Sequence, residues 1–488
     1  MPEVIDMNVL SLLLSLVLVL NMTLASVIIF RERRDIGSTW AWLLVLYFIP
    51  LLGFALYLFF AQNYRRSRLF EWKEIDRTGT EEAAREQLAL ISADGHAMGN
   101  PAAGDYHDLI AMHLKANKAL YTEDNEVELL LDGKQKFDRL FRDIAEAQDH
   151  IHVQYYIIQK DDLGTKLIRA LAAKARSGVS VRLLYDELGS RRLNRRILQE
   201  LRDAGGIAEA FFPSKFRLIN VRLNYRNHRK LVIIDGKVGY VGGFNVGDEY
   251  LGLDPKFGYW RDTHLRVRGG AVHAMQTRFI LDWNYASRAD IHYRPELFPE
   301  PEAAFGAAGV QIVASGPESK LEYIKNGYVK MISSAKRSIL IQTPYFVPDA
   351  GYLDALRIAA LSGVQVSIMI PDKPDHPFIY WATLSYIGVM LRTGVSVYLY
   401  RNGFIHAKTI VVDEEIASVG TANMDVRSFK LNFEVNAFLY DREVSAKLAE
   451  AFREDIKVSE ALTLERYGQR SRRIRIKESV SRLLSPIL

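Results

Sequence analysis

The 488-residue sequence contains no cysteine. This absence excludes disulfide bonds, zinc sites built from cysteine and a cysteine nucleophile. A large excess of one charge is also lacking, because 63 Lys and Arg stand against 58 Asp and Glu, for a net charge of +5. So small an excess fits an anionic membrane surface or a phosphate substrate and does not require nucleic acid. With 49% hydrophobic residues, the length predicts two or three globular domains.

Two stretches near the N-terminus lack charged residues altogether. Residues 9–30 and residues 40–61 are each long enough to cross a bilayer. Pro50 and Gly53 lie inside the second stretch, and membrane helices tolerate both. A cleaved signal peptide is the alternative for the first stretch, but its apolar core is too long and no basic segment precedes it. The sequence therefore predicts a transmembrane hairpin within residues 1–68, with spans at about 9–30 and 40–61.

Basic residues beside the two stretches predict the orientation of this hairpin. The loop between the stretches contains Arg31, Arg33 and Arg34. The segment after the second stretch contains Arg65, Arg66, Arg68, Lys73 and Arg77. Residues 2–8 contain no Lys or Arg. Five basic residues against three therefore favour a cytoplasmic location for the large remainder of the chain.

The pattern H-x-K-x-x-x-x-D occurs twice, about 180 residues apart. In both copies a glycine-containing turn follows, and an asparagine stands 17 positions after the histidine. The first copy contains His228, Lys230, Asp235 and Asn245, and the second contains His406, Lys408, Asp413 and Asn423. Two copies in register indicate a duplicated half-site. Two such halves can bring two imidazoles and two ammonium groups around one phosphate.

The segments around the two patterns repeat one order of elements, namely helix, strand, helix, Ser-Gly-Val and strand. In the first half these are the helix Phe137–Ala147, the strand His150–Ile158, the helix Leu163–Arg176 and the strand Ser180–Tyr185. In the second half they are the helix Tyr323–Ala335, the strand Ser338–Thr343, the helix Tyr352–Leu361 and the strand Gln365–Ile370. This alternation predicts the α/β class, with a layered sandwich in each half. We expect a linker at 69–104 and repeats at 105–300 and 301–488.

In each copy the histidine and lysine stand two positions apart beside an apolar run, which is Leu231–Ile234 in the first. Alternate side chains of a strand share a face, so the imidazole and the ammonium group point the same way. Asp235 and Asp413 complete the candidate catalytic set. Each lies seven positions after its histidine, so on an unbroken strand its side chain would point to the opposite face. Each also stands at the start of a turn. This position indicates a structural role for both.

These residue types suit transfer at a phosphodiester. Lys230, Lys408, Asn245 and Asn423 can bind the non-bridging oxygens, where negative charge concentrates in the transition state. A neutral imidazole, with an unperturbed pKa of about 6.5, can attack phosphorus to give a phosphohistidine. The other imidazole can protonate the departing alkoxide and then deprotonate the incoming alcohol. Because the lysines supply positive charge, we expect no metal or other cofactor.

Each histidine needs a carboxylate that orients its second ring nitrogen. Glu434 follows His406 by 28 positions in the second half, and Asp262 follows His228 by 34 positions in the first half. We expect these two carboxylates to orient the histidines, each within its own half. A surface salt bridge is the alternative for both.

The motifs together resemble the phospholipase D superfamily, and in detail its bacterial cardiolipin synthase branch. The stretches that carry the resemblance are Arg226–Lys230, Gly242–Tyr250, Thr343–Asp349, Phe404–Glu434 and the closing Arg482–Pro486. The resemblance covers nearly the whole chain. It implies two α/β sandwiches with mixed central sheets, packed face to face around one shared active site.

The same resemblance implies an activity and a location. A phosphatidyltransferase of this family joins two phosphatidylglycerol molecules into cardiolipin and glycerol through a phosphatidyl-histidine. The family pattern makes His228 the nucleophile and His406 the general acid, whereas chemical reasoning alone leaves the two undistinguished. The expected partners are phosphatidylglycerol, cardiolipin and a membrane, without nucleic acid. The expected location is the bacterial inner membrane, with a multi-pass anchor.

Other readings of the same residues remain open at this point. A phospholipase D would transfer the phosphatidyl group to water, and phosphatidylethanolamine or another alcohol could serve as donor or acceptor. A nuclease would call for a strongly basic groove with stacking aromatics and no membrane spans. A non-enzymatic scaffold would not need two intact signatures.

Two further segments allow two interpretations each. The C-terminal segment 466–488 combines seven basic residues with apolar ones. It is either a solvated tail or an interfacial segment that contacts anionic lipid. Pro377–Leu391 is rich in aromatic and apolar residues. It either lines an entrance for lipid or forms an ordinary core helix.

Overall fold

The computed structural model describes residues 7–32, 36–49, 52–53, 57, 80–93, 99–193, 195–213, 224–287, 290–300, 304–319 and 321–484. The chain divides into two compact units. The small unit is built from Met1–Ser67 and Ser214–Tyr225, and the large unit from Arg68–Pro213 and Arg226–Pro486. Each is described by itself.

The described part of the small unit is helical. It contains α1 (Met7–Val27), the π-helical turn η1 (Ile28–Glu32) and α2 (Ile36–Phe48). Ile28, Trp42, Leu46 and Tyr57 form a small buried cluster. The Asn21 side-chain amide donates a hydrogen bond to the Leu46 carbonyl across 3.2 Å, which ties α1 to α2.

The transmembrane hairpin expected over 9–30 and 40–61 is not supported. Within the described residues, no helix is both long enough and apolar enough to cross a membrane. α2 covers 13 residues, whereas a span needs about 20. Positions 50, 51, 54–56 and 58–61 of the second stretch lie outside the described residues.

The first half of the large unit follows three helices. These are α5 (Thr80–Ala93), α6 (Pro101–Asp105) and α7 (His107–Asn117). The half itself runs β1 (Tyr121–Asp132), α8 (Gly133–Glu146), β2 (His150–Tyr155), α9 (Asp162–Arg176), β3 (Ser180–Asp186), α10 (Arg195–Asp203), β4 (Ile207–Phe211), β5 (Leu231–Ile234), β6 (Val238–Gly242), η3 (Asp248–Leu251), β7 (Trp260–Arg268) and α11 (Ala271–Ala286). The short turn η4 (Pro295–Leu297) leads to the second half.

The second half repeats this order with a few additions. It runs β8 (Ala308–Ser315), α12 (Tyr323–Ser334), β9 (Ser338–Gln342), β10 (Phe346–Val347), α13 (Ala350–Leu361), β11 (Gln365–Pro371), α14 (Pro377–Arg392), β12 (Ser396–Tyr400), β13 (Phe404–Ile405), β14 (Thr409–Val412), β15 (Ile416–Gly420), β16 (Met424–Asp425), α15 (Val426–Lys430), β17 (Glu434–Tyr440), α16 (Arg442–Lys457), β18 (Ser459–Ala461), α17 (Leu464–Gly468) and α18 (Arg472–Leu484). The eight helices and strands expected around the Ser-Gly-Val segments are present within a few residues of their expected ends.

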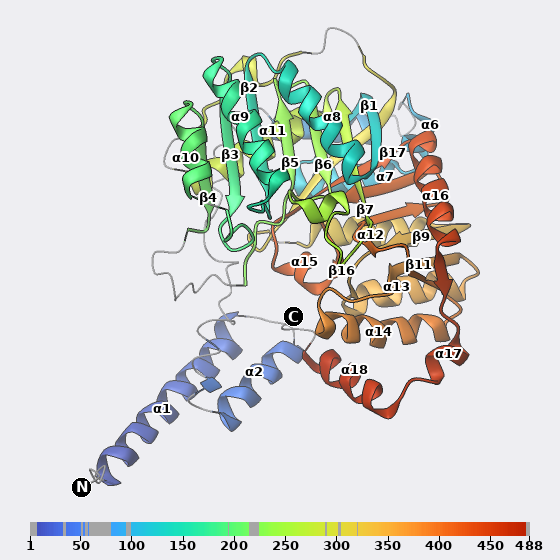
Figure 1. Ribbon diagram of the computed structural model, residues 1–488. Helices are drawn as coiled ribbons and strands as arrows, with labels where there is room; N and C mark the ends of the chain where they lie inside the picture. Colours follow the sequence, from blue (N-terminus) through green and yellow to red (C-terminus); the bar gives the residue numbers. More distant parts are fainter. Residues whose placement is uncertain are drawn as a thin grey trace. The chain divides into compact units, whose positions relative to one another are not determined.

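One large mixed sheet joins the two halves (Figure 1). Its strand order is β18-β12-β11-β9-β14-β15-β17-β8-β1-β7-β6-β5-β2-β3-β4. Read outward from the antiparallel β8–β1 pair, the two halves show the same sequence of strands. In each, the three strands β9, β11 and β12 or β2, β3 and β4 are parallel and the inner ones antiparallel, and the second half adds the antiparallel edge strand β18. Strands β6 and β7 also contact β15 and β17, so the two halves meet over their inner strands.

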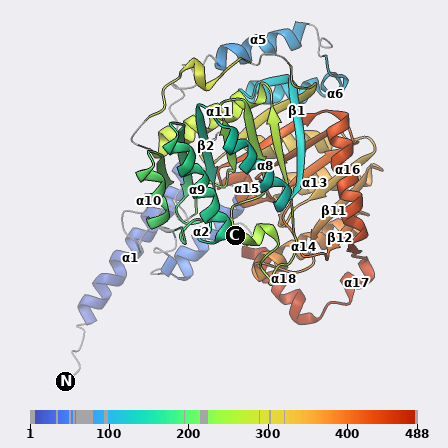
Figure 2. The ribbon, with the colours of Figure 1, turned by 45° about the horizontal axis from the view of Figure 1, so that its top comes forward.

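Each half has helices on both faces of its strands, because the buried side chains of the central strand alternate. Ile151 and Val153 of β2 pack in the core with α8, α9 and α10, which lie along one side of the strands in Figures 1 and 2. His152 points the other way and stacks on Phe279 of α11, with ring centroids 4.6 Å apart. The second half places α12, α13 and α14 on one face and α16 on the other. This three-layer arrangement explains the near-continuous apolar runs of the central strands.

The two Ser-Gly-Val segments end the helices α9 and α13 in the same way. Gly178 and Gly363 have φ values of +95° and +96°, in the region that glycine adopts without strain. The next residue in each donates its N–H back to the helix, Val179 to Lys174 and Val364 to Ala359. The local chemistry of the repeat is therefore retained in the fold.

The C-terminal segment is helical as far as it is described. α18 packs against α14, and two of its basic side chains lie over aromatic rings of that helix. Lys477 lies 4.4 Å from the ring of Trp381, and Arg482 lies 4.9 Å from that of Tyr386. Residues 485–488 lie outside the described part. The segment is therefore attached to the large unit through cation–π contacts rather than extended into solvent.

Candidate active site

Each signature segment runs beside a strand of the other half. Asn227 pairs in parallel with Phe433, and the His228 N–H donates to the Phe433 carbonyl across 2.9 Å. In the same way β13 pairs in parallel with β7, and the His406 N–H donates to the Arg261 carbonyl across 2.7 Å. The signature histidines therefore lie just before β5 and β14, in extended segments held by the opposite half.

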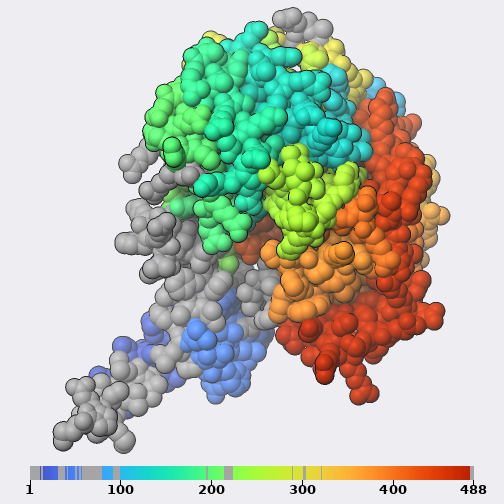
Figure 3. Space-filling view, viewed as in Figure 1, coloured from blue at the N-terminus to red at the C-terminus, as the bar shows by residue number. Residues whose placement is uncertain are grey.

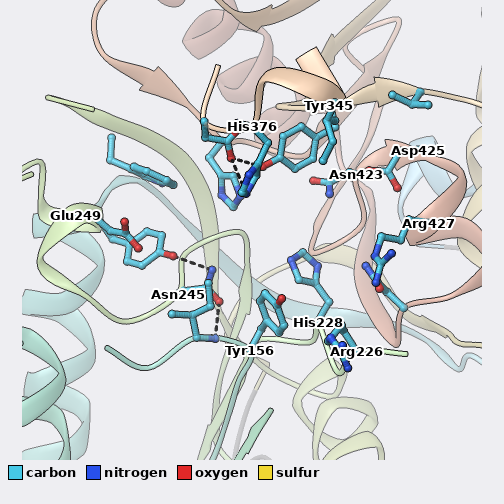
Figure 4. Close-up of a pocket in the computed structure, with 18 of the residues that line it drawn as sticks. Tyr156, Arg226, His228, Asn245, Glu249, Tyr345, His376, Asn423, Asp425 and Arg427 are labelled. Atoms are coloured by element: carbon cyan, nitrogen blue, oxygen red, sulfur yellow. Dashed lines mark hydrogen bonds and ion pairs between the residues drawn. The ribbon is translucent and has the colours of Figure 1, made fainter. Parts of the chain in front are cut away.

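Both signature histidines line one pocket with a volume of about 530 Å³. Both asparagines, Asn245 and Asn423, line it as well (Figure 4). In the space-filling view (Figure 3), the yellow-green segment near residue 250 lies against the orange segment near residue 375, and both contribute to the wall. The volume is in the range of pockets that bind small molecules or lipid headgroups.

His228 contacts a buried glutamate. Its Nδ1 lies 2.9 Å from an oxygen of Glu434, and Glu434 is fully buried. Thr421 donates its hydroxyl to the same oxygen across 2.5 Å, and Asn432 donates its amide to the other across 3.2 Å. Burial alone would raise the pKa of Glu434, but His228 and Lys230 outweigh it and hold this pKa below its ordinary value. The glutamate is thus a fixed anion behind the imidazole.

His406 contacts a buried aspartate in a matching way. Its Nδ1 lies 2.6 Å from Asp262 Oδ2, and the other oxygen accepts the Thr263 N–H across 2.7 Å. Gly243 follows the first signature, and a Cβ at this position would lie 1.9 Å from Asp262 Oδ1. The glycine of that turn is therefore needed because the carboxylate occupies the space.

The carboxylates cross between the halves, so the pairing expected within each half is wrong. Glu434 belongs to the second half and contacts His228, whereas Asp262 belongs to the first half and contacts His406. The reason is the parallel pairing described above, since each signature segment lies beside the strand that carries the other half's carboxylate. Neither half contains a complete pair by itself.

The crossed pairs define which ring nitrogen can react. A carboxylate accepts hydrogen bonds, so Nδ1 of each histidine carries the proton and donates it. Nε2 then has a free lone pair in the neutral imidazole. Burial lowers the pKa of both rings, followed for His406 by the charge of Lys408, and the pKa of His406 falls to about 4. Near neutral pH both rings are therefore neutral and able to act as nucleophile or base.

The signature lysines are completely buried beside the histidines. Lys230 donates to the carbonyl of His228 across 2.7 Å, and Lys408 donates to that of His406 across 2.5 Å. Burial lowers the pKa of Lys230 to about 7 and that of Lys408 to about 8, although the charges of Glu434 and Asp262 oppose this. Neither lysine is among the residues that line the pocket, but each stands two positions after a histidine that does. A bound anion there would stabilise the two ammonium groups.

The two asparagines are held differently. The Asn245 side chain accepts the Ile157 N–H across 3.1 Å and donates to the Tyr250 hydroxyl across 3.1 Å. Asn423 donates its backbone N–H to Ser428, while its side-chain oxygen is buried without a hydrogen bond. Both amides face the pocket (Figure 4). They are placed to contact a ligand there.

Asp235 and Asp413 do not line the pocket. Asp235 accepts backbone N–H bonds from residues 148, 149 and 150, and Asp413 accepts them from residues 336, 337 and 338. Their φ values are +53° and +54°, which aspartate tolerates in a turn. Each carboxylate thus fastens the start of its central strand, β2 or β9, to the turn after the signature strand. This geometry agrees with the structural role predicted from their position seven residues after the histidines.

The described residues contain no group of three or more His, Asp or Glu arranged to hold a metal ion.

Comparison with known proteins agrees with this geometry. The model of the family described as "Cardiolipin synthase, PLD-like domain" matches residues 140–255 and 328–456, which include both signatures. The chain is 63% identical to the major cardiolipin synthase ClsA of Bacillus subtilis, over 99% of this chain and 100% of the relative. It is 55% identical to the cardiolipin synthase of Oceanobacillus iheyensis, over 99% and 100%. The chain belongs to the cardiolipin synthase family, of the phospholipase D superfamily.

A second family model and a solved structure each match part of this chain. A family model described as "Phospholipase_D-nuclease N-terminal" matches residues 19–62. The crystal structure of phosphatidylserine synthase from Haemophilus influenzae aligns with a TM-score of 0.60, covering 78% of this chain and 100% of the other. At 15% identity this second match shows a shared fold.

Several pocket residues of this family member were not among the predicted site residues. Tyr156 packs edge-on against His228, with centroids 5.0 Å apart. The Tyr345 hydroxyl donates to Asp375, and Arg226 and Arg427 also line the wall. Tyr156 directly follows the central strand β2, and Tyr345 stands three residues after the end of β9, the ends of strands at which ligands of α/β proteins commonly bind. That position is the signal that could have identified the two tyrosines.

Proposed function

We propose that this protein is a phosphatidyltransferase that makes cardiolipin from two molecules of phosphatidylglycerol and releases glycerol. The observation that carries the proposal is the pair of imidazoles in one pocket, each with Nδ1 on a buried carboxylate from the opposite half. Membership of the cardiolipin synthase family and the 63% identity to the B. subtilis enzyme support the activity.

The first step forms a covalent intermediate. Nε2 of His228 attacks the phosphorus of a phosphatidylglycerol, a P–N bond forms, and the bond from phosphorus to the glycerol oxygen breaks. The leaving oxygen takes a proton from Nε2 of His406, so glycerol departs neutral. The lysine ammonium groups and the two asparagine amides stabilise the charge on the non-bridging oxygens.

The second step runs in the opposite direction with a different alcohol. Nε2 of His406 removes the proton from the terminal hydroxyl of a second phosphatidylglycerol. That oxygen attacks phosphorus, the P–N bond breaks, and its electron pair returns to His228. Cardiolipin leaves and both imidazoles regain their starting state. We assign the nucleophile to His228 because the family resemblance does so.

The bound phosphodiester changes the proton affinity of the general acid. In the free protein burial holds the pKa of His406 at about 4. A phosphate anion in the pocket opposes this by adding negative charge beside the ring. His406 therefore gains a proton when the lipid binds and can donate it to the leaving group.

The activity is tested with the full chain in vesicles of labelled phosphatidylglycerol, with the products resolved by mass spectrometry. We expect equal amounts of cardiolipin and glycerol from the wild type, and no cardiolipin from the His228→Ala variant. Phosphatidic acid as the main product would instead identify a phospholipase D. Cardiolipin at the wild-type rate from His228→Ala would refute the site.

We also propose that the segments 105–300 and 301–488 are the two functional repeats, with 69–104 as a linker. The mirrored strand order supports this division. The test is coexpression of 1–300 and 301–488 as separate chains. We expect activity only when both are present, because each repeat supplies the carboxylate for the other's histidine.

For the N-terminal segment we propose attachment to the bacterial cytoplasmic membrane, with the large unit on the cytoplasmic side. Leu12, Leu16 and Phe30 of the small unit are exposed apolar side chains, which supports contact with lipid. Because the chain has no cysteine, a single one can be introduced as Ser333→Cys in the large unit. In intact cells we expect no labelling by a maleimide that cannot cross membranes. Labelling without cell lysis would contradict this orientation.

A further inference from the structure

The pocket has one cationic wall, although the two halves that build it are repeats. Two positions show the difference. Two residues before the signature histidine stands Arg226 in the first half and Phe404 in the second. Four residues after the signature asparagine stands Glu249 in the first half and Arg427 in the second. Since the signature segments cross, both arginines belong to the same wall.

Both arginines line the pocket close to His228. Arg226 is buried, with 6% of its surface exposed, and Arg427 is half-buried. Figure 4 shows them on the side of the pocket where His228 and Tyr156 lie, with Glu249 on the opposite side. The cationic wall is therefore part of the same cavity as the reacting histidine.

The charges around these arginines are mixed, because Asp425 lines the same wall beside Arg427 and Asp186 lies near Arg226. Burial lowers the pKa of Arg226, and the neighbouring guanidinium groups of Arg427 and Arg191 lower it further, although Asp186 opposes them. Asp186 already accepts the N–H groups of Leu188, Gly189 and Asn227. A phosphate at this wall would lie between the positive charges of the two arginines and reduce their repulsion. Guanidinium groups bind phosphate in a bidentate manner.

The proposed reaction needs a second anion site. The reacting phosphate lies between the histidines, beside the two lysines and two asparagines. The acceptor lipid brings its own phosphate, three carbons away from the hydroxyl that attacks. Water and free glycerol, the competing acceptors, carry no such charge. A cationic wall next to the nucleophile can therefore distinguish the acceptor lipid from both.

We propose that Arg226 and Arg427 bind the phosphate of the acceptor lipid and so direct the phosphatidyl group to an anionic alcohol rather than to water. This inference rests on the proposed function and specifies its acceptor site. The arginines act in the second step and do not touch the donor phosphate. The two arginines thus determine which acceptor the enzyme prefers.

The test compares two soluble acceptors that share the same terminal glycerol group. One is glycerol, which is neutral, and the other is glycerophosphoglycerol, which carries a phosphate three carbons from the hydroxyl. With full-length enzyme and phosphatidylglycerol as donor, we expect a preference for the anionic acceptor in kcat/KM. In Arg427→Gln this preference falls about tenfold to a hundredfold, the usual effect of losing a charged hydrogen bond.

Exchange of labelled glycerol into phosphatidylglycerol measures donor binding and the first step alone. We expect the exchange rate of Arg427→Gln to stay within about twofold of wild type, and Arg427→Lys to regain part of the preference. Lys430→Gln is the matched control, because it removes a positive charge from the same helix at a residue that contacts Glu322 at 3.9 Å and does not line the pocket.

The outcomes separate the two proposals. No preference for the anionic acceptor in the wild type would overturn the acceptor site. A parallel fall of exchange and transfer in Arg427→Gln would also overturn it, because the arginine would then act on the donor or on folding. Absence of both exchange and cardiolipin in the wild type would instead refute the proposed function.

Discussion

The two halves of the large unit bury matching aspartates, but the arginines that bind them both come from the first half, one from the segment before β5 and one from β7. In the first half Asp282 of α11 accepts a hydrogen bond from Gln154 and binds Arg229 at 2.7 Å. In the second half Asp455 of α16 accepts one from Gln342 and binds Arg261 at 2.9 Å. The glutamines and aspartates correspond between the repeats.

The two arginines do not correspond. Arg229 stands between the signature histidine and lysine, where the second half has Ala407. Arg261 stands directly before Asp262, where the second half has Phe433 before Glu434. Each arginine nevertheless fixes a strand that carries a histidine-binding carboxylate. Arg229 donates to the Glu434 carbonyl across 3.0 Å, and Arg261 adjoins Asp262 in sequence. Each buried aspartate therefore has a guanidinium beside it, and both guanidinium groups come from the first half.

The largest effect is expected from the crossed carboxylates. Glu434→Gln and Asp262→Asn should each lower kcat by about 10²–10⁴-fold, because an amide no longer fixes the tautomer that leaves Nε2 free. If the halves are equivalent in this respect, the two losses will be similar. Steady-state rates of cardiolipin formation measure them. Glu415→Gln, a carboxylate outside the pocket, is the control and should keep the wild-type rate.

The two buried Arg–Asp pairs should differ in how far a second substitution restores the folding stability. Arg261→Met should lower the free energy of unfolding by about 3–5 kcal/mol, because the Asp455 carboxylate loses its guanidinium partner. Arg229→Met should also destabilise the fold, because Asp282 loses one of its two guanidinium partners and the carbonyls of Glu434 and Ser315 lose a donor. Adding Asp455→Leu to Arg261→Met should restore part of this loss, since no charge is then left alone. Adding Asp282→Leu to Arg229→Met should not, because Arg278 binds Asp282 at 2.8 Å and would lose its partner. Denaturant unfolding measures the free energy of unfolding of both double variants. An equal gain over the two single variants would contradict this difference.

The pH dependence should show the two lysines titrating in sequence. A lysine is charged below its pKa, so Lys230 loses its charge as the pH rises past about 7, and Lys408 past about 8. We expect kcat/KM to fall above this range, by about tenfold per pH unit for each essential charge. The pH–rate profile of the wild type measures this, and Lys230→Arg should remove the limb near pH 7. A rate that still increases at pH 9 would show that neither charge is needed.

The smallest effect is expected from the signature aspartates. Asp235→Ala and Asp413→Ala each remove an acceptor of three backbone N–H groups. We expect a stability loss of about 1–3 kcal/mol and a kcat within about threefold of wild type. Thermal unfolding and activity measured on the same preparations test this. A large loss of kcat in a fully folded variant would show that the substituted aspartate takes part in catalysis.

The repeated pattern predicted the two histidines and two asparagines that line the pocket, but not Tyr156, Tyr345, Arg226 or Arg427. Spacing alone identified His228 and His406, and strand alternation identified the elements around them. It could not predict which carboxylate contacts which histidine, because that depends on pairing between segments 206 and 144 residues apart. The roles of Arg229 and Arg261 could not be predicted either, since both stand in the first half and the corresponding positions of the second half hold Ala407 and Phe433. Length and hydropathy predicted a hairpin at the N-terminus that the described residues do not support.

The most direct test of the account is to find where the phosphatidyl group is bound. A phosphatidyl ester of p-nitrophenol needs no general acid to leave, so it reports the first step alone. With this substrate we predict a burst of one p-nitrophenol per chain in His406→Ala, with the phosphatidyl group on His228 by peptide mass spectrometry. We predict no burst in His228→Ala. A burst from His228→Ala, or no histidine adduct in either variant, would contradict two imidazoles acting on one phosphorus.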